Sequence, residues 1–325
     1  MNKPAEREIV DKVYTLKRDW AIEASESPDF LCMAEGKPIL GIEVTGYHHS
    51  ETHARLRHME NYVLDLLDGK PIRHKDDKTL KISEIEIQDR DGKSKQKSLK
   101  AVIQEIPSIE RRIELLSEIV ERKSQKCPIY LANTPDVDLL IDDREHGFWF
   151  KDFSSLYHSL LTNQRCRKAL TVTKFREIIL ATTTPGEDGK KRVSIPLRAN
   201  MIVEHVQIFA QLFTEFSEQH GIKNDYEPFC SILAACLTNL GYGNARIELA
   251  PGILSIQFAS IEMRLSDADG VVVRDHLCLP NLQGQGETAS ARTHHISNDF
   301  IQFASYLLAE RQKLICSVPL HFPIT

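Results

Sequence analysis

The sequence predicts a mixed α/β fold divided into two domains, and three observations lead to this prediction. Segments with the apolar spacing of helices alternate with short apolar runs bounded by Gly, Pro, Asn or Asp, as in helices packed on a sheet. A length of 325 residues exceeds that of one average domain. Residues 182–191 contain Thr, Gly, Pro and charged residues but no apolar side chain, which is typical of a linker. We therefore expect one domain over 1–183 and a second, α+β domain over 192–325.

The composition is that of an ordinary globular protein, with 42% hydrophobic and 27% charged residues. No apolar run approaches the roughly 18 residues of a membrane helix, and the polar N-terminus does not resemble a signal peptide. The 7 cysteines show no C-x-x-C spacing, which favours reduced thiols in the cytoplasm. We therefore expect a cytoplasmic protein with no membrane contact. The net charge of −5 gives no general attraction to nucleic acid, so such binding would need a local basic patch.

The first expected element is a helix over residues 5–20. Ile9, Val13, Leu16 and Trp20 recur at the spacing of a single apolar helix face. Glu6 borders that face. Its carboxylate has two interpretations: a member of a functional cluster, or a charge that the helix dipole favours in a first turn.

A β-hairpin is expected next. Residues 27–33 and 39–45 are short apolar runs, and Gly36 and Pro38 mark a turn between them. Each run carries one carboxylate among apolar neighbours.

These carboxylates belong to Asp29 and Glu43. Side chains alternate along strands, so pairing of Met33 with Ile39 would place Asp29 opposite Glu43. Two carboxylates that close repel each other unless a proton or a cation lies between them. Mg²⁺, which binds through one or two carboxylates, water and phosphate, fits this arrangement. The alternative is an exposed hairpin with two solvated carboxylates.

Pro28-Asp29, followed by the segment Gly41-Ile42-Glu43-Val44-Thr45, resembles the metal-binding half-site of the PD-(D/E)XK nuclease-like superfamily. It is especially similar to divergent members that carry Glu-Val-Thr where the motif usually ends in lysine. The resemblance covers about residues 1–183 and implies a restriction-endonuclease-like αβββαβ core. It also implies Mg²⁺ or Mn²⁺ as the cofactor and nucleic acid as the partner, with DNA favoured over RNA.

The same resemblance implies roles for individual residues. Asp29 and Glu43 would be the metal ligands, and a glutamate of the first helix would complete the acidic cluster. Glu6 is the candidate for that position, with Glu8 and Glu23 as alternatives.

Residues 51–67 are expected to form a helix that Ser50 caps. His49 and His53 are four residues apart, a spacing that could hold a metal or support proton transfer near neutral pH. Because no acidic or cysteine partner follows at ligand spacing, the other interpretation is a pair of surface histidines beside the site.

Residues 79–89 and 99–106 are expected to be strands on either side of a hairpin signal, Asp91-Gly92. A row of lysines between them would share one face of an extended chain: Lys93, Lys95 and Lys97. Such a row could follow a phosphate backbone or could simply protect a strand edge.

The clearest helix is expected over residues 109–126. Its apolar face, which Ile113, Leu116 and Val120 define, continues to Lys123. One interpretation is a last-turn lysine whose stem packs on the apolar face. The other, which the resemblance implies, is that Lys123 replaces the lysine missing beside Glu43.

The rest of the first domain is expected to contain strands at 128–131, 137–141 and 175–181, and a helix at 153–168. The resulting order agrees with the αβββαβ core that the resemblance implies. In the second domain, we expect a mixture of helices and strands: helices over 200–219, 228–240 and 299–313, and strands over 246–249, 253–258, 261–265 and 271–273. It carries no catalytic pattern, so we expect it to serve target choice or oligomerisation.

These expectations combine into one hypothesis and one alternative. The hypothesis is a Mg²⁺-dependent nuclease in which Lys123 positions water or phosphate, with prokaryotic defence as the context that such families suggest. Thr45 stands where the motif lysine is usual, which puts catalysis in doubt. The alternative is an inactive nuclease-like module that binds nucleic acid or a protein partner.

Overall fold

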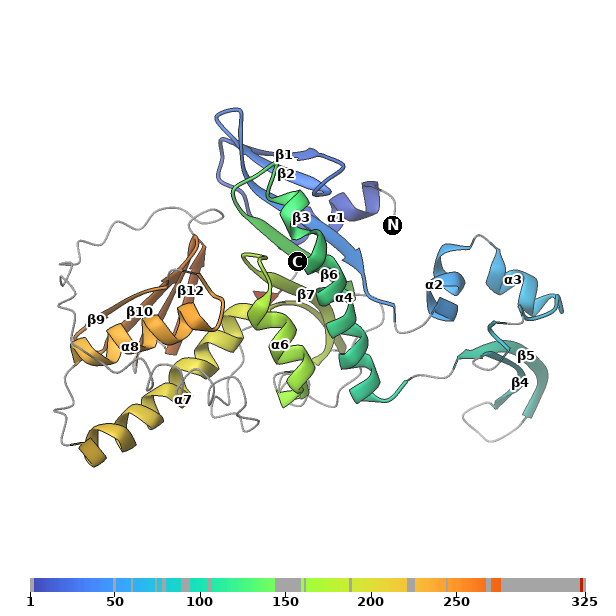
Figure 1. Ribbon diagram of the computed structural model, residues 1–325. Coiled ribbons are helices and arrows are strands. Elements are labelled where there is room, and N and C mark those ends of the chain that lie inside the picture. Colours follow the sequence, from blue (N-terminus) through green and yellow to red (C-terminus); the bar gives the residue numbers. More distant parts are fainter. Residues whose placement is uncertain are drawn as a thin grey trace.

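A computed structural model of the chain describes residues 3–48, 51–59, 61–73, 75–77, 80–88, 94–104, 107–143, 159–160, 162–186, 189–220, 226–243, 245–266, 270–275 and 322–323. The fold is mixed α/β, with a central mixed sheet and two smaller antiparallel sheets. The central sheet lies in the middle of the molecule and one small sheet lies towards each end (Figure 1).

The central sheet has the strand order β1-β2-β3-β6-β7-β8-β13. Strands β1 to β3 form an antiparallel meander, and β6 and β7 run parallel to β3. Strand β8 is antiparallel to β7, and β13 is antiparallel to β8. The strand bounds are β1 (Trp20–Ala24), β2 (Phe30–Ala34), β3 (Lys37–Gly46), β6 (Val137–Asp143), β7 (Ile178–Gly186), β8 (Gly189–Pro196) and β13 (Phe322–Pro323).

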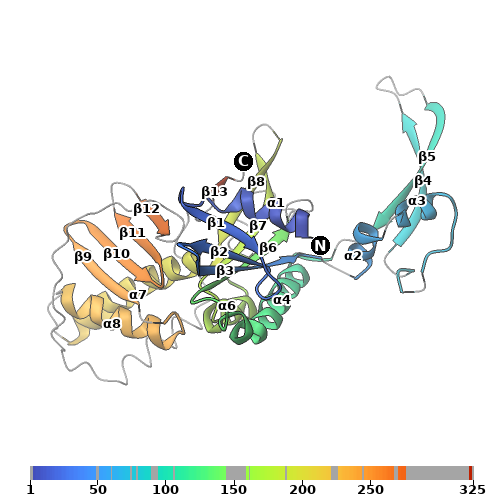
Figure 2. The ribbon, with the colours of Figure 1, turned by 90° about the horizontal axis from the view of Figure 1, so that it is seen from above.

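Helices cover both faces of this sheet (Figure 2). Helix α1 (Lys3–Val13) packs on one face, where Ile42 and Val44 of β3 join its cluster of buried side chains. Helices α4 (Ile109–Tyr130) and α6 (Gln164–Val172) pack on the other face. Because side chains alternate along β3, the residue between Ile42 and Val44 points towards α4. That residue is Glu43.

A small lobe is inserted between β3 and α4 and projects from the body in both views (Figures 1 and 2). This insertion lobe comprises α2 (Glu51–His58), α3 (Tyr62–Leu67), β4 (Leu80–Gln88) and β5 (Ser94–Gln104). Its helices are joined through Asp76, which is fully buried and accepts hydrogen bonds from Thr52, Arg55 and Tyr62. The Arg55 guanidinium holds the pKa of Asp76 down at about 2, so this carboxylate stays charged.

The second half agrees closely with the elements expected from the sequence. Helices α7 (Leu197–His220) and α8 (Tyr226–Asn239) precede an antiparallel sheet, here called the C-terminal sheet. Its strands are β9 (Arg246–Ala250), β10 (Ile253–Phe258), β11 (Ile261–Ser266) and β12 (Gly270–Asp275). The expected helix over 299–313 lies outside the described residues.

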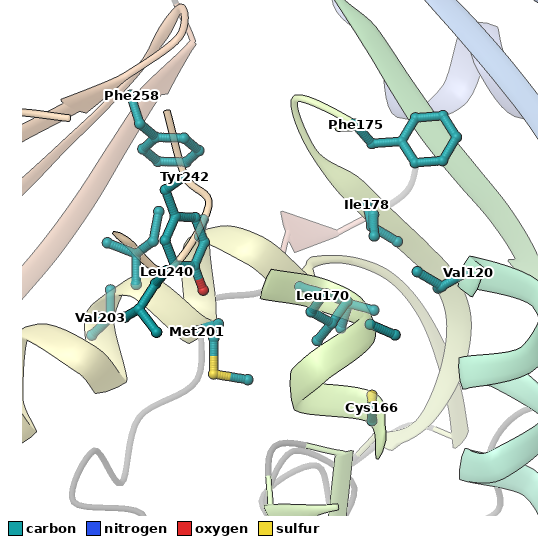
Figure 3. Close-up of a cluster of buried hydrophobic side chains, with 14 of the residues drawn as sticks. Val120, Cys166, Leu170, Phe175, Ile178, Met201, Val203, Leu240, Tyr242 and Phe258 are labelled. Atoms are coloured by element: carbon teal, nitrogen blue, oxygen red, sulfur yellow. The ribbon is translucent and has the colours of Figure 1, made fainter. Parts of the chain in front are cut away.

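One continuous core joins the two halves. Val120 of α4, Leu170 of α6 and Ile178 of β7 belong to the same buried cluster as Met201 of α7 and Phe258 of β10 (Figure 3). The C-terminal sheet and its helices therefore share their apolar interior with the central sheet.

The first correction concerns residues 14–24. The expected helix over 5–20 ends at Val13, and Trp20 instead begins strand β1, which pairs with β2. Tyr14 completes the buried side of α1, and Ile22 packs into the same cluster from the strand. The hairpin expected from the sequence is thus a three-stranded meander.

Two helix boundaries also differ. The helix expected over 51–67 breaks at Asn61, whose φ of 62° is left-handed and cannot continue a right-handed helix. Residues 128–131 were expected to form a strand, but α4 continues through Pro128 to Tyr130. Cys127 and Tyr130 are buried and extend the apolar face of α4 by one more turn, which explains why the helix does not stop before the proline.

The linker expected over 182–191 is wrong. This segment is a hairpin in which β7 pairs with β8, from Thr182 opposite Val193 to Gly186 opposite Gly189. Threonine favours strands, and the Gly-containing turn reverses the chain without ending the sheet. Strand β7 also starts at Ile178, three positions later than expected, and Phe175 packs in the core before it.

Other expectations are confirmed or fall on undescribed residues. The hairpin over 79–106 is present as β4 and β5, but its Asp91-Gly92 turn and Lys93 lie outside the described residues. Strand β6 confirms the strand expected over 137–141. Of the helix expected over 153–168, residues 153–158 and 161 are outside the described part, and α6 covers Gln164–Val172. The five cysteines in the described residues are free thiols.

Candidate active site

The β2–β3 hairpin brings Asp29 and Glu43 to the same place in the sheet. Phe30 pairs with Ile42, and one residue further this register sets Asp29 opposite Glu43. The expected pairing of Met33 with Ile39 is wrong, because an irregularity after Cys32 pairs Met33 with Pro38. From Cys32, which pairs with Leu40, back to Phe30, the register is nevertheless the expected one.

The loop before β2 sets the position of Asp29. Its Oδ2 accepts a hydrogen bond of 2.9 Å from the backbone N–H of Val44. The preceding Pro28 packs against Gly41 so closely that a Cβ at Gly41 would lie 2.5 Å from the Pro28 ring. The Asn133 amide also donates to the Ser27 carbonyl at 2.6 Å. Gly41 therefore permits the close approach that holds Asp29 beside β3.

Two residues of α4 bind the Glu43 carboxylate. Lys123 Nζ lies 2.5 Å from Glu43 Oε1, and the Tyr130 hydroxyl donates to the same oxygen at 2.9 Å. Glu43 and Tyr130 are both buried. The two donors are seven positions apart, so they lie two helical turns apart on one face of α4. Lys123, which the sequence singled out as a charge that continues an apolar helix face, therefore lies beside Glu43.

Glu6 lies in the first turn of α1 and is buried, with 8% of its surface exposed. Burial raises the pKa of the Glu6 carboxyl, and the negative charge of Asp29 raises it further. Glu43 adds a smaller contribution of the same sign to this pKa. Glu6 therefore interacts electrostatically with Asp29 and, more weakly, with Glu43, and these three carboxylates are called the acidic group.

Lys3 is a member of this group that the sequence did not suggest. Its Nζ lies 2.8 Å from Asp29 Oδ1 and also donates to the Ser25 carbonyl at 2.7 Å. Partial burial lowers the pKa of Lys3, but the hydrogen bond to Asp29 and the negative charges of Asp29, Glu6 and Glu26 together outweigh burial and raise that pKa. A sequence signal existed, because Lys3 and Glu6 are three positions apart and share a helix face.

The two alternatives to Glu6 have other surroundings. Glu8 forms an ion pair with Lys12 on the exposed side of α1. Glu23 is exposed in β1, opposite Leu31.

His49 lies outside the described residues, and its partner in the expected pair, His53, is buried, not on the surface. The His53 ring makes an edge contact with His48, with ring centroids 5.5 Å apart. Two members of the expected lysine row, Lys95 and Lys97, lie within β5. Lys100, further along the same strand, is exposed, and its Nζ lies 3.4 Å from the Leu67 carbonyl.

Two further buried ion groups belong to the framework. Arg176 binds Asp138 through Nε at 2.8 Å and donates to Ser260 at 2.6 Å, which ties β6 to the turn after β10. Glu177 accepts hydrogen bonds from the backbone N–H groups of Arg198 and Ala199 and so caps α7. Burial raises the pKa of Glu177 to about 7. These ion groups join the two halves of the chain, and their charged side chains are bound by other residues of the protein.

The chemistry of the candidate site follows from its charges. Three carboxylates, from Glu6, Asp29 and Glu43, lie among two ammonium groups, from Lys3 and Lys123. The carboxylate oxygens are hard donors of the kind that Mg²⁺ and Mn²⁺ prefer. Within the described part of the chain, no group of three or more His, Cys, Asp or Glu side chains is arranged so that it could hold a metal ion. An ion here would be held by Asp29 and Glu43, with water completing the coordination as is usual for Mg²⁺.

The comparisons with protein-family models, curated proteins and solved structures gave no match to this chain. No helix in the described ranges is long and apolar enough to cross a lipid bilayer. The functional proposal therefore depends on the geometry of these residues.

Proposed function

We propose that this protein is a Mg²⁺- or Mn²⁺-dependent nuclease that hydrolyses phosphodiester bonds. The observation that carries the proposal is the contact of Lys123 Nζ with Glu43 Oε1 at 2.5 Å, across 80 residues of sequence. The order α1-β1-β2-β3-α4-β6, with the insertion lobe between β3 and α4, supports the αβββαβ core of the restriction-endonuclease-like fold.

In this proposal, Asp29 and Glu43 hold the metal ion. When bound, the ion supplies a coordinated water of lowered pKa and stabilises the charge that develops on the phosphate. Lys123 orients the water or pairs with the phosphate, because its ammonium lies beside a metal-holding carboxylate. Glu6, whose raised pKa favours a bound proton, supplies or accepts a proton next to Asp29.

The substrate in this proposal is nucleic acid, with DNA favoured over RNA and prokaryotic defence as the setting. Because the net charge is −5, binding depends on local cations near the site, among which Lys3 and Lys123 belong to the site itself. The insertion lobe is attached next to β3 and α4, the elements that carry Glu43 and Lys123. We expect it to contact the substrate. The C-terminal sheet would serve target choice or oligomerisation.

A second candidate is a module of the same fold that binds nucleic acid or a protein partner without cleaving it. Two observations favour it: each of Asp29 and Glu43 already pairs with one lysine, and the described residues contain no group of three or more His, Cys, Asp or Glu side chains that could hold a metal ion. Such a module would keep its binding when these carboxylates are replaced.

Calorimetric titration with Mg²⁺ and Mn²⁺ tests the proposal, followed by a cleavage assay on labelled DNA and RNA. The samples are the wild type, Asp29→Asn, Glu43→Gln and, as the matched control, Glu35→Gln, which removes an exposed carboxylate from the turn of the same hairpin. We expect both site variants, and not the control, to lose metal binding and cleavage together. Metal binding without cleavage of any substrate would favour the second candidate, and no metal binding by the wild type would refute the nuclease.

A further inference from the structure

We propose that Tyr130 is a positioning residue of this site: its hydroxyl holds Oε1 of Glu43 and leaves Oε2 for the metal ion. The inference rests on the proposed function and deepens it, because it names how the metal ligand is oriented.

Both donors of α4 bind the same carboxylate oxygen. The Tyr130 hydroxyl lies 2.9 Å from Oε1 and Lys123 Nζ lies 2.5 Å from it. Among the described residues, Oε2 accepts no hydrogen bond. A carboxylate with two donors on one oxygen is fixed in orientation, and its other oxygen is available as a ligand.

Tyr130 is suited to this role because it is rigid and stays protonated. Its side chain is 4% exposed, and its ring packs against Phe175 with centroids 6.2 Å apart. Burial raises the pKa of the phenol, and the charge of Glu43 raises it further. The hydroxyl is therefore a neutral donor over the whole working range of pH.

A neutral donor can stay bound to Glu43 beside a cation, and a charged lysine cannot. Lys123 would be repelled by a divalent cation held at Glu43, and its ammonium would have to turn towards water or phosphate to act in cleavage. Tyr130 carries no charge and is not repelled, so it keeps hold of Oε1 when Lys123 leaves. Without it, the Glu43 carboxylate would be free to rotate with the lysine.

The test is Tyr130→Phe, which removes one hydroxyl and keeps the ring against Phe175. We expect Mg²⁺ affinity to fall about 10-fold, as is typical when the hydrogen-bond partner of a metal ligand is removed. Cleavage should need correspondingly more Mg²⁺ and recover largely at saturation. The matched control is Tyr14→Phe, which removes another buried phenol–carboxylate hydrogen bond, the 3.0 Å contact with Asp138 Oδ2 behind the site.

Thermal melting of both variants separates structural damage from the positioning role. We expect similar melting losses for Tyr130→Phe and Tyr14→Phe, and weaker metal binding only for the first. Wild-type Mg²⁺ affinity in Tyr130→Phe, with binding still abolished in Glu43→Gln, would overturn this inference and leave the nuclease proposal standing. A wild type that binds neither Mg²⁺ nor Mn²⁺ would overturn both.

Discussion

Replacing Gly41 by alanine should displace Asp29 although the two residues do not share a strand. The added Cβ would lie 2.5 Å from Pro28 Cγ, 2.8 Å from Thr134 Cγ2 and 3.3 Å from Val137 Cγ2. Carbon atoms in contact are normally about 3.5–4.0 Å apart, so the shortest distance is about 1 Å too small. The Pro28 ring is closed onto its own backbone and cannot rotate away, so the Pro28 loop must move.

Overpacking of this size destabilises by about 1–3 kcal/mol. We expect Gly41→Ala to lower the urea midpoint without changing the slope of the transition, and to weaken Mg²⁺ binding because Pro28 carries Asp29 with it. Gly36→Ala is the control. Gly36 has a φ of 71° and no atoms within 4 Å of an added Cβ, so alanine there costs about 1–2 kcal/mol of backbone strain without moving Asp29. Wild-type stability together with wild-type metal affinity in Gly41→Ala would refute this reasoning.

Four further predictions concern the charges. Lys3→Met should bind Mg²⁺ a few-fold more tightly in calorimetry, since it removes a cation that competes for Asp29; unchanged or weaker binding would contradict this. Lys123→Gln should keep metal binding but lose cleavage, and loss of both would instead mean that the lysine only maintains the fold. For Glu6, the folded-state pKa lies above the unfolded value, so the wild type loses stability as pH rises through that interval. Glu6→Gln lacks this loss, and its stability relative to the wild type in urea titrations should grow from pH 4 to 7. For Asp76, the folded-state pKa is depressed to about 2, so about 2 kcal/mol of stabilisation is present above pH 4 and disappears towards pH 2. Asp76→Asn should abolish that pH dependence in hydrogen exchange of the insertion lobe.

Local patterns predicted much of the fold. Helical spacing anticipated α4, α7 and α8, and alternation anticipated the hairpins over 27–45 and 79–106 and the strands of the C-terminal sheet. Periodicity also singled out Lys123 as a charge on an apolar face, and that residue lies beside Glu43. These features depend on residues close in sequence, which is why they could be recognised.

The predictions were wrong where pairing with a distant segment of the chain determines the local structure. Trp20 continues the apolar spacing of α1 but packs as an edge strand because β2 is available to pair with it. The polar segment after Ala181 resembles a linker until β8 pairs with it. The contacts of Lys3 with Asp29 and of Tyr130 with Glu43 join residues 26 and 87 positions apart, so no local pattern could predict them.

The shared interior has a practical consequence for how this protein is dissected. A cut after residue 183 would divide β7, remove its partner β8 and take away the α7 side chains that belong to the same core cluster as Val120 and Leu170. Each fragment would expose a large apolar surface. Loss of activity in either fragment would then result from misfolding and would not show which half carries the function. Roles of the two halves are therefore best assigned by single substitutions in the intact chain, with each exchange confined to one contact.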